Sequence, residues 1–463
     1  MDQELSPSLQ EKVALVGELL KSFPQAASAV DQLLGLPIGR MRLKRVTERI
    51  GGERVAERDR DAEQVAQLRL MDKAVAVDGQ DRRAGRRHTA GGHGGRFQQN
   101  VAQPDSGKHW YEYKAGLCLT LGSLTDANDT TAPRGDPCPE VPLSLLNFEH
   151  VETLTREIAQ RVASSSRSLP SELRPDETGV LLEELRASTQ LDDIVAAAQN
   201  VVHEQQRSPR ELPFSPKIKS REVVATTSNA SEFGRLLIAR AWRQGLFQAK
   251  RKGFVADGGS WLWTLFVTAF QPFGFEGILD IIHAVTHVFA AAMADRDRAA
   301  GWVIYHRWIT WIWQGQVSRV IAELQTRARE LGEPTDTDTD TDTDTDTDTD
   351  TDTDTDTDTD PVTSPRHIVA STLTYLQNHQ QYMNYPRYRE LGLLITSSVM
   401  ESTMKELNYR VKGTEKFWSQ PEAEALLQLR SDRLSGSQPL KTFWTTRQKT
   451  RPGLHARSRL TPA

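Results

Sequence analysis

The stretch KGFVADGG, residues 252–259, is a short apolar run that ends in Asp257 and Gly258. The run has the length of a buried strand, and glycine allows the backbone to turn sharply after it. A carboxylate in this place lies at the edge of a sheet, where ions and phosphates can approach. The same dipeptide also forms ordinary tight turns, so Asp257 alone does not identify a site.

The same pattern occurs earlier in the chain. KAVAVDG, residues 73–79, is an apolar run that leads into Asp78 and Gly79. A Gly-, Arg- and His-rich segment follows, which we interpret as a loop. YEYKAGLCLTLG, residues 111–122, then has the β-branched and aromatic content of a strand. Two strands that end in Asp, in a chain otherwise rich in helical periodicity, predict an α/β fold.

Composition divides the chain into segments. Thirteen Thr-Asp repeats at residues 335–360 contain no apolar side chain and repel one another, which predicts an extended, solvated spacer. The predicted organisation is 1–70, helical and possibly DNA-binding; 71–295, the core, with a Pro- and Ser-rich connection near 125–215; 296–334, a helical insertion; 335–360, the spacer; 361–435, helices that complete the core; and 436–463, a basic tail.

Two segments of the sequence each allow two structural interpretations. Gly51 and Gly52 interrupt a basic helical stretch, which fits a helix-turn-helix or, more simply, a helical hairpin. WVIYHRWITWIWQ, residues 302–314, suits a helical core, or else a platform on which an unpaired base stacks.

Charge and cysteine content narrow the class of protein. The net charge of −5 becomes +8 once the Asp residues of the spacer are set aside, so the remainder is basic and suits a phosphate-rich partner. A solvated basic face is the equally good alternative. Cys118 and Cys138 have no zinc-site spacing, and residues 261–294 are too often interrupted by polar groups to span a membrane. We therefore expect a cytoplasmic protein.

Residues 375–434, which begin YLQNHQQYMNYPRYRELG, closely resemble the C-terminal half of insertion-sequence DDE transposases of the ISKra-type, Mutator-related group. The Glu of a Ser-x-x-Glu-Ser stretch completes the catalytic triad of that group, which indicates Glu401. FVADGGSWLW, residues 254–263, matches its second-Asp motif and indicates Asp257. ILDIIHA, residues 278–284, is similar to its Asp-x-x-His motif and indicates Asp280 and His283 as supporting residues.

The resemblance implies an RNase H-like core with a helical N-terminal region and an all-helical insertion. It implies DNA transposition, in which strands are cleaved at the element's terminal repeats and joined to target DNA. Two Mg²⁺ ions, or Mn²⁺ in their place, would be held by Asp257, Glu401 and a first Asp, for which Asp78 is our candidate from the apolar run before it. The expected partners are DNA and a second copy of the chain, with no membrane involved, and the expected location is the cytoplasm, on chromosomal DNA.

Basic side chains follow Glu401 along its predicted helix. Lys405, Arg410 and Lys412 could donate hydrogen bonds to DNA phosphates, although ordinary surface charge explains them as well. Glu401 also has an alternative role, because Ser398 and Glu401 have the spacing of a capping box.

The chain departs from the transposase group at the position of the first catalytic Asp. An Asp-Gly-Gly-Arg stretch is expected shortly before the HWYEYK segment, but this chain has HGGR, with His93 in place of the Asp. Asp78 lies fifteen residues earlier, after the better strand pattern. A segment read out of frame from Arg82 to Gly94 would explain the difference. The alternatives to an active enzyme are a DNA-binding remnant that lacks this ligand and a helical scaffold.

Overall fold

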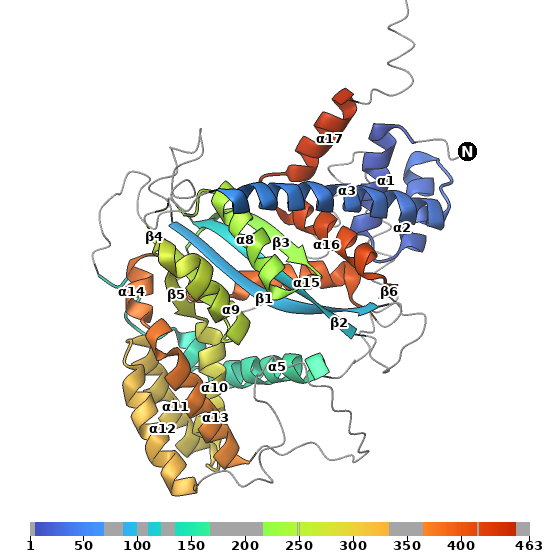
Figure 1. Cartoon of the computed structure of the whole chain (residues 1–463). Coiled ribbons are helices and arrows are strands. Elements are labelled where there is room, and N and C mark those ends of the chain that lie inside the picture. Colours follow the sequence, from blue (N-terminus) through green and yellow to red (C-terminus); the bar gives the residue numbers. More distant parts are fainter. Residues whose placement is uncertain are drawn as a thin grey trace, which may run out of the picture.

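The computed structural model describes residues 5–68, 87–99, 110–121, 135–166, 216–247, 249, 251–332, 364–413 and 416–450 (Figure 1). For residues 87–99, 110 and 160–166 it describes the backbone alone. Within these ranges six strands form one sheet in the order β3-β2-β1-β4-β5, with β6 paired to β1. The strands are β1 Arg87–Gln99, β2 Trp110–Leu121, β3 Ile218–Thr226, β4 Arg251–Ala256, β5 Glu276–Leu279 and β6 Phe417–Trp418.

Strand direction places the ends of β4 and β5 together. β2 runs antiparallel to its neighbours β1 and β3, whereas β4 and β5 run parallel to β1. Ala256 pairs with Leu279 at the end of this parallel pair. Asp257 and Asp280, the next residues along the two strands, therefore lie at one edge of the sheet. A mixed sheet packed between helices agrees with the predicted α/β class.

The central strand differs from the prediction. β1, whose sequence is RHTAGGHGGRFQQ, lies between β2 and β4 and is hydrogen-bonded to both. The interpretation of this Gly-, Arg- and His-rich segment as a loop is therefore wrong. Pairing with strands that are distant in sequence outweighs its weak β propensity. Asp78 and the rest of KAVAVDG lie outside the described residues.

Helices cover both faces of the sheet. Side chains 113 and 118 of β2 point to opposite faces. The Tyr113 hydroxyl donates to Oδ1 of Asn408 on α15 (Ser398–Val411) at 2.8 Å. Cys118 lies close enough to Arg240 on α8 (Ala230–Arg243) for that charge to act on its thiol. α15, which carries Glu401, is thus fixed to the sheet on the face opposite α8.

The N-terminal helices pack on this core rather than forming a separate hairpin. They are α1 Pro7–Leu19, α2 Phe23–Leu34 and α3 Arg40–Gln67, and α3 runs unbroken through Gly51 and Gly52. A Cβ atom at Gly51 would lie 2.5 Å from the carbonyl oxygen of Ala425 on α16 (Gln420–Leu434). The glycine thus permits a close crossing of α3 and α16, and the predicted break at this position is wrong.

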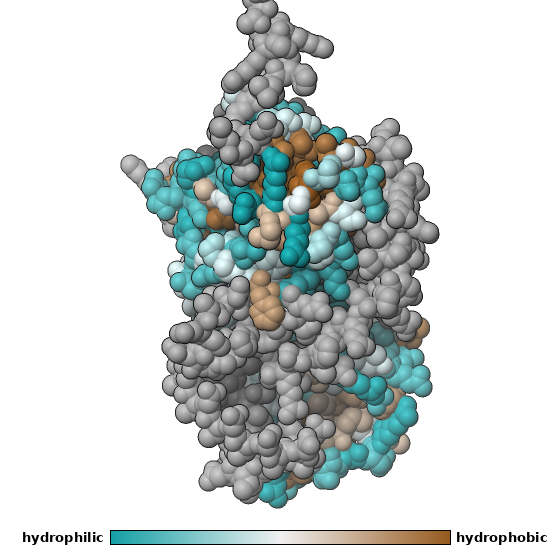
Figure 2. All heavy atoms as spheres, turned by 90° about the vertical axis from the view of Figure 1, so that its right-hand side faces the viewer, coloured by the Kyte–Doolittle hydropathy of each residue, from teal (hydrophilic) through white to brown (hydrophobic). Residues whose placement is uncertain are grey.

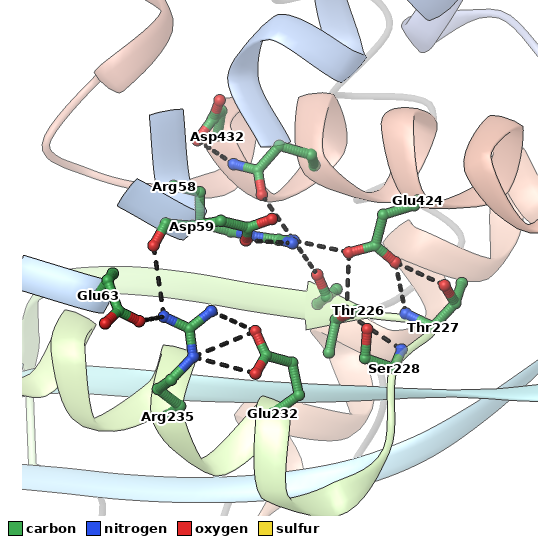
Figure 3. A network of polar contacts seen from close by, with 12 residues as sticks. Arg58, Asp59, Glu63, Thr226, Thr227, Ser228, Glu232, Arg235, Glu424 and Asp432 are labelled. Atoms are coloured by element: carbon green, nitrogen blue, oxygen red, sulfur yellow. Dashed lines mark hydrogen bonds and ion pairs between the residues drawn. The ribbon is translucent and has the colours of Figure 1, made fainter. Parts of the chain in front are cut away.

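A buried polar network joins α3, α16 and the end of β3 (Figure 3). Glu424 of α16 accepts hydrogen bonds from Thr226 Oγ1 at 2.8 Å and from the Thr227 backbone N–H at 2.6 Å. Arg58 of α3 donates to the same carboxylate at 2.8 Å. Because the Arg58 and Glu424 side chains are only 9% and 12% exposed, this ion pair is a structural joint and not a surface contact.

The C-terminal region also departs from the predicted basic tail, because residues Pro439–Thr450 form the helix α17. Arg447 of α17 makes an ion pair with Glu53 of α3. Figure 2 views the side of the molecule on which α1, α2 and α17 lie, and its coloured surface is mostly hydrophilic around a small hydrophobic area near the top.

A second group of helices lies below the sheet in Figure 1. Tyr305, Trp308 and Trp313 are buried there, which confirms the helical-core interpretation of the aromatic segment. Its long helices are α5 Phe148–Ser166, α10 Ile281–Met293, α11 Arg298–Trp313, α12 Val317–Leu331 and α13 Pro365–His379. The short elements of the fold are η2 Leu143–Leu146, α9 Ser260–Leu265, η3 Phe266–Phe270, η4 Gln271–Phe273, η6 Gln380–Tyr382 and α14 Tyr385–Glu390.

Candidate functional site

Asp257 stands directly after β4, as the sequence predicted. Phe254, Val255 and Ala256 before it are buried, so the strand is anchored in the core. Gly258 has φ +118°, a conformation that other residues rarely adopt, and this turns the chain immediately after the carboxylate. Oδ1 of Asp257 accepts a hydrogen bond from the Gly259 N–H at 3.1 Å.

Asp280 occupies the corresponding position after β5 and is fully buried. It begins α10, and its Oδ1 accepts a hydrogen bond from the Ile282 N–H at 2.9 Å. Its Oδ2 lies 3.1 Å from Nδ1 of His283 and accepts from both the N–H and the hydroxyl of Ser397. Burial by itself would raise the pKa of Asp280, but the hydrogen bonds from His283, Ser397 and Ile282 hold it below its usual range.

The pKa of His283 is affected by two of the predicted site carboxylates besides Asp280, those of Asp257 and Glu401. Burial alone would lower its pKa, but Asp280, and then the charges of Asp257 and Glu401, raise the pKa to about 9. At neutral pH the imidazole is therefore a cation. Asp257 follows β4, and Asp280 follows its parallel neighbour β5. Glu401 lies in the first turn of α15, whose cap residue Ser397 binds the Asp280 carboxylate. Asp257 and Glu401 therefore lie on two elements that are each joined to the Asp280 segment.

Glu401 lies in the first turn of α15. The segment before this helix is tied to the start of α10, because the Ile281 N–H donates to the Ile395 carbonyl at 3.0 Å and Ser397 binds Asp280. α15 begins at Ser398 with Ser397 as its cap residue and has no side-chain cap hydrogen bond. The capping-box alternative for Glu401 is therefore wrong. Such a box is found instead at the start of α16, between Ser419 and Glu422.

The register of the sheet locates the residue that faces Asp257 on the central strand. β1 and β4 are paired up to Gly91 and Val255. Two residues further along each strand are His93 and Asp257, and His93 is still paired, with Ala115 of β2. Position 93 is thus level with Asp257 on the neighbouring strand. His93, the residue at this level, is the one that stands where the resemblance leads us to expect the first Asp.

The three predicted phosphate donors differ in exposure. Lys405 and Lys412 are exposed on α15 and just beyond it. Arg410 is fully buried, donates to the Gly17 carbonyl at 3.0 Å and lies 4.5 Å from the centre of the Phe23 ring. Burial lowers its pKa to about 10. The prediction that Arg410 binds DNA is wrong, because the guanidinium holds α15 against α1.

Two side chains of α13 near the site were not identified from the sequence. The Tyr375 hydroxyl donates to the Asp257 carbonyl at 3.0 Å, and His379 is hydrogen-bonded to the Gly258 backbone. Their spacing of four residues places them on one helix face. That spacing was the available signal, but it is also common in helices that have no site.

Within the described part of the chain, no three His, Cys, Asp or Glu side chains form a group able to hold a metal ion. No described helix is long and apolar enough to cross a membrane. Comparisons with protein-family models, with curated proteins and with solved structures give no match for this chain.

Proposed function

We propose that the chain is a DNA transposase with an RNase H-like core. Two observations support the core: the strand order β3-β2-β1-β4-β5 and a β2 that alone runs antiparallel to the rest. The observation that carries the catalytic proposal is that the elements bearing Asp257 and Glu401 both join the Asp280 segment: β4 pairs with β5, and Ser397, the cap residue of α15, binds the Asp280 carboxylate. The two carboxylates come from β4 and α15, and their convergence is what cleavage of DNA with bound metal ions requires.

The described residues supply some, but not all, of the ligands that the proposed metal ions need. Asp257 and Glu401 offer the oxygen ligands that Mg²⁺ and Mn²⁺ prefer. A bound pair of such ions supplies an activated water and stabilises the leaving oxygen of the cleaved strand. The chain itself contributes a charged His283, held by Asp280, that offsets part of the repulsion between the carboxylates.

The proposed partners are DNA, as terminal repeats and target, and a second copy of the chain. Lys405 lies one helical turn beyond Glu401, on the same face of α15, and its ammonium group is exposed. It is the described side chain best placed to bind a phosphate beside the proposed site. Lys412, beyond the helix end, is the second candidate.

A DNA-binding remnant without cleavage activity is the second candidate function. The observation in its favour is that His93 stands level with Asp257 on β1, where the resemblance leads us to expect the third carboxylate. Such a protein would keep its basic surface and its affinity for DNA but would cleave poorly, because one metal ligand would be lacking.

Nicking of a supercoiled plasmid that carries the DNA flanking the coding sequence tests the proposal. We expect nicking in Mg²⁺ or Mn²⁺, none in EDTA, and none from Asp257→Asn or Glu401→Gln. Asp297→Asn is the matched control, because Asp297 caps α11 from an exposed position and Asn caps equally well. Salt-dependent binding without nicking would favour the remnant, and the absence of salt-dependent DNA affinity would contradict both candidates.

A further inference from the structure

Helix α13 packs on the turn that carries Asp257. The Tyr375 hydroxyl donates to the Asp257 carbonyl at 3.0 Å. Its ring lies against Gly258, since a Cβ atom added there would be only 2.7 Å from Cε2 of Tyr375. One side chain therefore holds both residues of the Asp-Gly turn, the first by its carbonyl and the second by contact with the ring.

The Tyr375 ring is itself held from the other side. His287 of α10 stacks on it with a centroid separation of 4.0 Å. The Thr372 hydroxyl donates to the His287 carbonyl at 3.3 Å, which fixes α13 to α10 at this level. His379 Nδ1 lies 2.8 Å from the Tyr375 carbonyl, and the same imidazole is hydrogen-bonded to the Gly258 backbone. Tyr375 therefore has little freedom to move away from the turn.

We propose that Tyr375 is a positioning residue for the Asp257 carboxylate. The direction in which a carboxylate points depends on its own backbone, and the Asp257 peptide is held by the Tyr375 hydroxyl. Without that hydrogen bond the turn can rotate around Gly258, whose φ is +118°, and the carboxylate loses the orientation that its contact with the Gly259 N–H now gives it. This inference rests on the proposed function, in which Asp257 is a metal ligand.

Mn²⁺ binding to the full chain, measured by electron paramagnetic resonance, tests the inference. Asp257→Asn defines the binding that depends on Asp257. Tyr375→Phe removes the hydroxyl and keeps the ring, and we expect it to weaken this Mn²⁺ binding about tenfold, as the loss of groups that orient metal ligands does. The matched control is Tyr305→Phe, because Tyr305 donates to the Leu145 carbonyl at 3.0 Å, away from Asp257.

The outcomes separate the inference from the proposed function. If Asp257→Asn binds Mn²⁺ as the native chain does, the proposed function fails and the inference fails with it. If Asp257→Asn loses binding while Tyr375→Phe binds as tightly as native, only the positioning role is overturned. A merely structural tyrosine would lower the melting temperature in both tyrosine variants and change Mn²⁺ affinity in neither.

Discussion

Replacement of Asp280 by Asn is expected to loosen the joint between β5, α10 and α15. Oδ2 of Asp280 accepts hydrogen bonds from the Ser397 N–H and hydroxyl and lies 3.1 Å from His283 Nδ1. An amide nitrogen in that place would face donors, and the His283 cation would lose its buried partner. Breaking a buried ion pair costs about 3–5 kcal/mol, so we expect Asp280→Asn to lower the free energy of unfolding by about that amount.

The same variant should change the pH dependence of stability. The folded pKa of His283 is raised from 6.5 to about 9, so its bound proton stabilises the fold fully below pH 6.5. That contribution, about 3 kcal/mol from the size of the shift, is lost as the pH rises through 9. Asp280 is the largest cause that raises the pKa, so most of this pH dependence should disappear in Asp280→Asn.

Urea denaturation followed by tryptophan fluorescence, at a pH below 6.5 and at a pH above 9, measures both effects. Asp297→Asn serves as the control, because Asp297 also begins a helix but has no buried cation beside it. The reasoning is refuted if Asp280→Asn unfolds at the same urea concentration as the native chain. It is also refuted if the difference in stability between the two pH values equals that of the Asp297→Asn control.

Four further variants test other parts of the account. His93→Asp places a carboxylate level with Asp257 and should raise Mg²⁺-dependent plasmid nicking; activity no higher than that of the native chain would contradict this. Lys405→Ala should weaken DNA binding and reduce the slope of log affinity against log salt concentration by about 1. Arg410→Ala should instead lower the melting temperature, and the slope should be unchanged in the protein that still folds. Glu424→Ala removes the acceptor shared by Arg58, Thr226 and the Thr227 N–H, while Arg58 keeps its ion pair with Asp59. It should cost about 2 kcal/mol in a denaturation experiment, as the loss of partners for partly buried donors does; a cost below about 0.5 kcal/mol would show that the joint is not structural.

The sequence predicted those features of the fold and of the site whose signal lies in a few consecutive residues. The apolar run before Asp257 predicted both a strand and its end, because a buried strand and a following glycine leave a clear local signature. The Asp-x-x-His motif indicated Asp280 and His283 as supporting residues, and the structure has Oδ2 of Asp280 3.1 Å from Nδ1 of His283. The proposed convergence of Glu401 with Asp257 could be expected only from the resemblance, since nothing local relates two elements so distant in sequence.

Features that depend on distant packing were not predictable in the same way. β1 has almost no β propensity and is a central strand because β2 and β4 pair with it on either side. Gly51 looked like a helix break, but it permits the close approach of α16. Arg410 looked like a surface cation, and only the packing of α1 and Phe23 around it shows that it is buried. In each case the deciding neighbour is far away in the sequence.

Cleavage of the polypeptide by bound Fe²⁺ tests the central claim most directly. Fe²⁺ in place of Mg²⁺, with ascorbate and peroxide, produces radicals that cut the chain only near the metal. The account predicts cuts beside Asp257, Asp280 and Glu401 together, all suppressed by excess Mg²⁺ and absent from Asp257→Asn. Cuts near Asp257 without cuts near Glu401, or the reverse, would contradict the claim that these two carboxylates share one site.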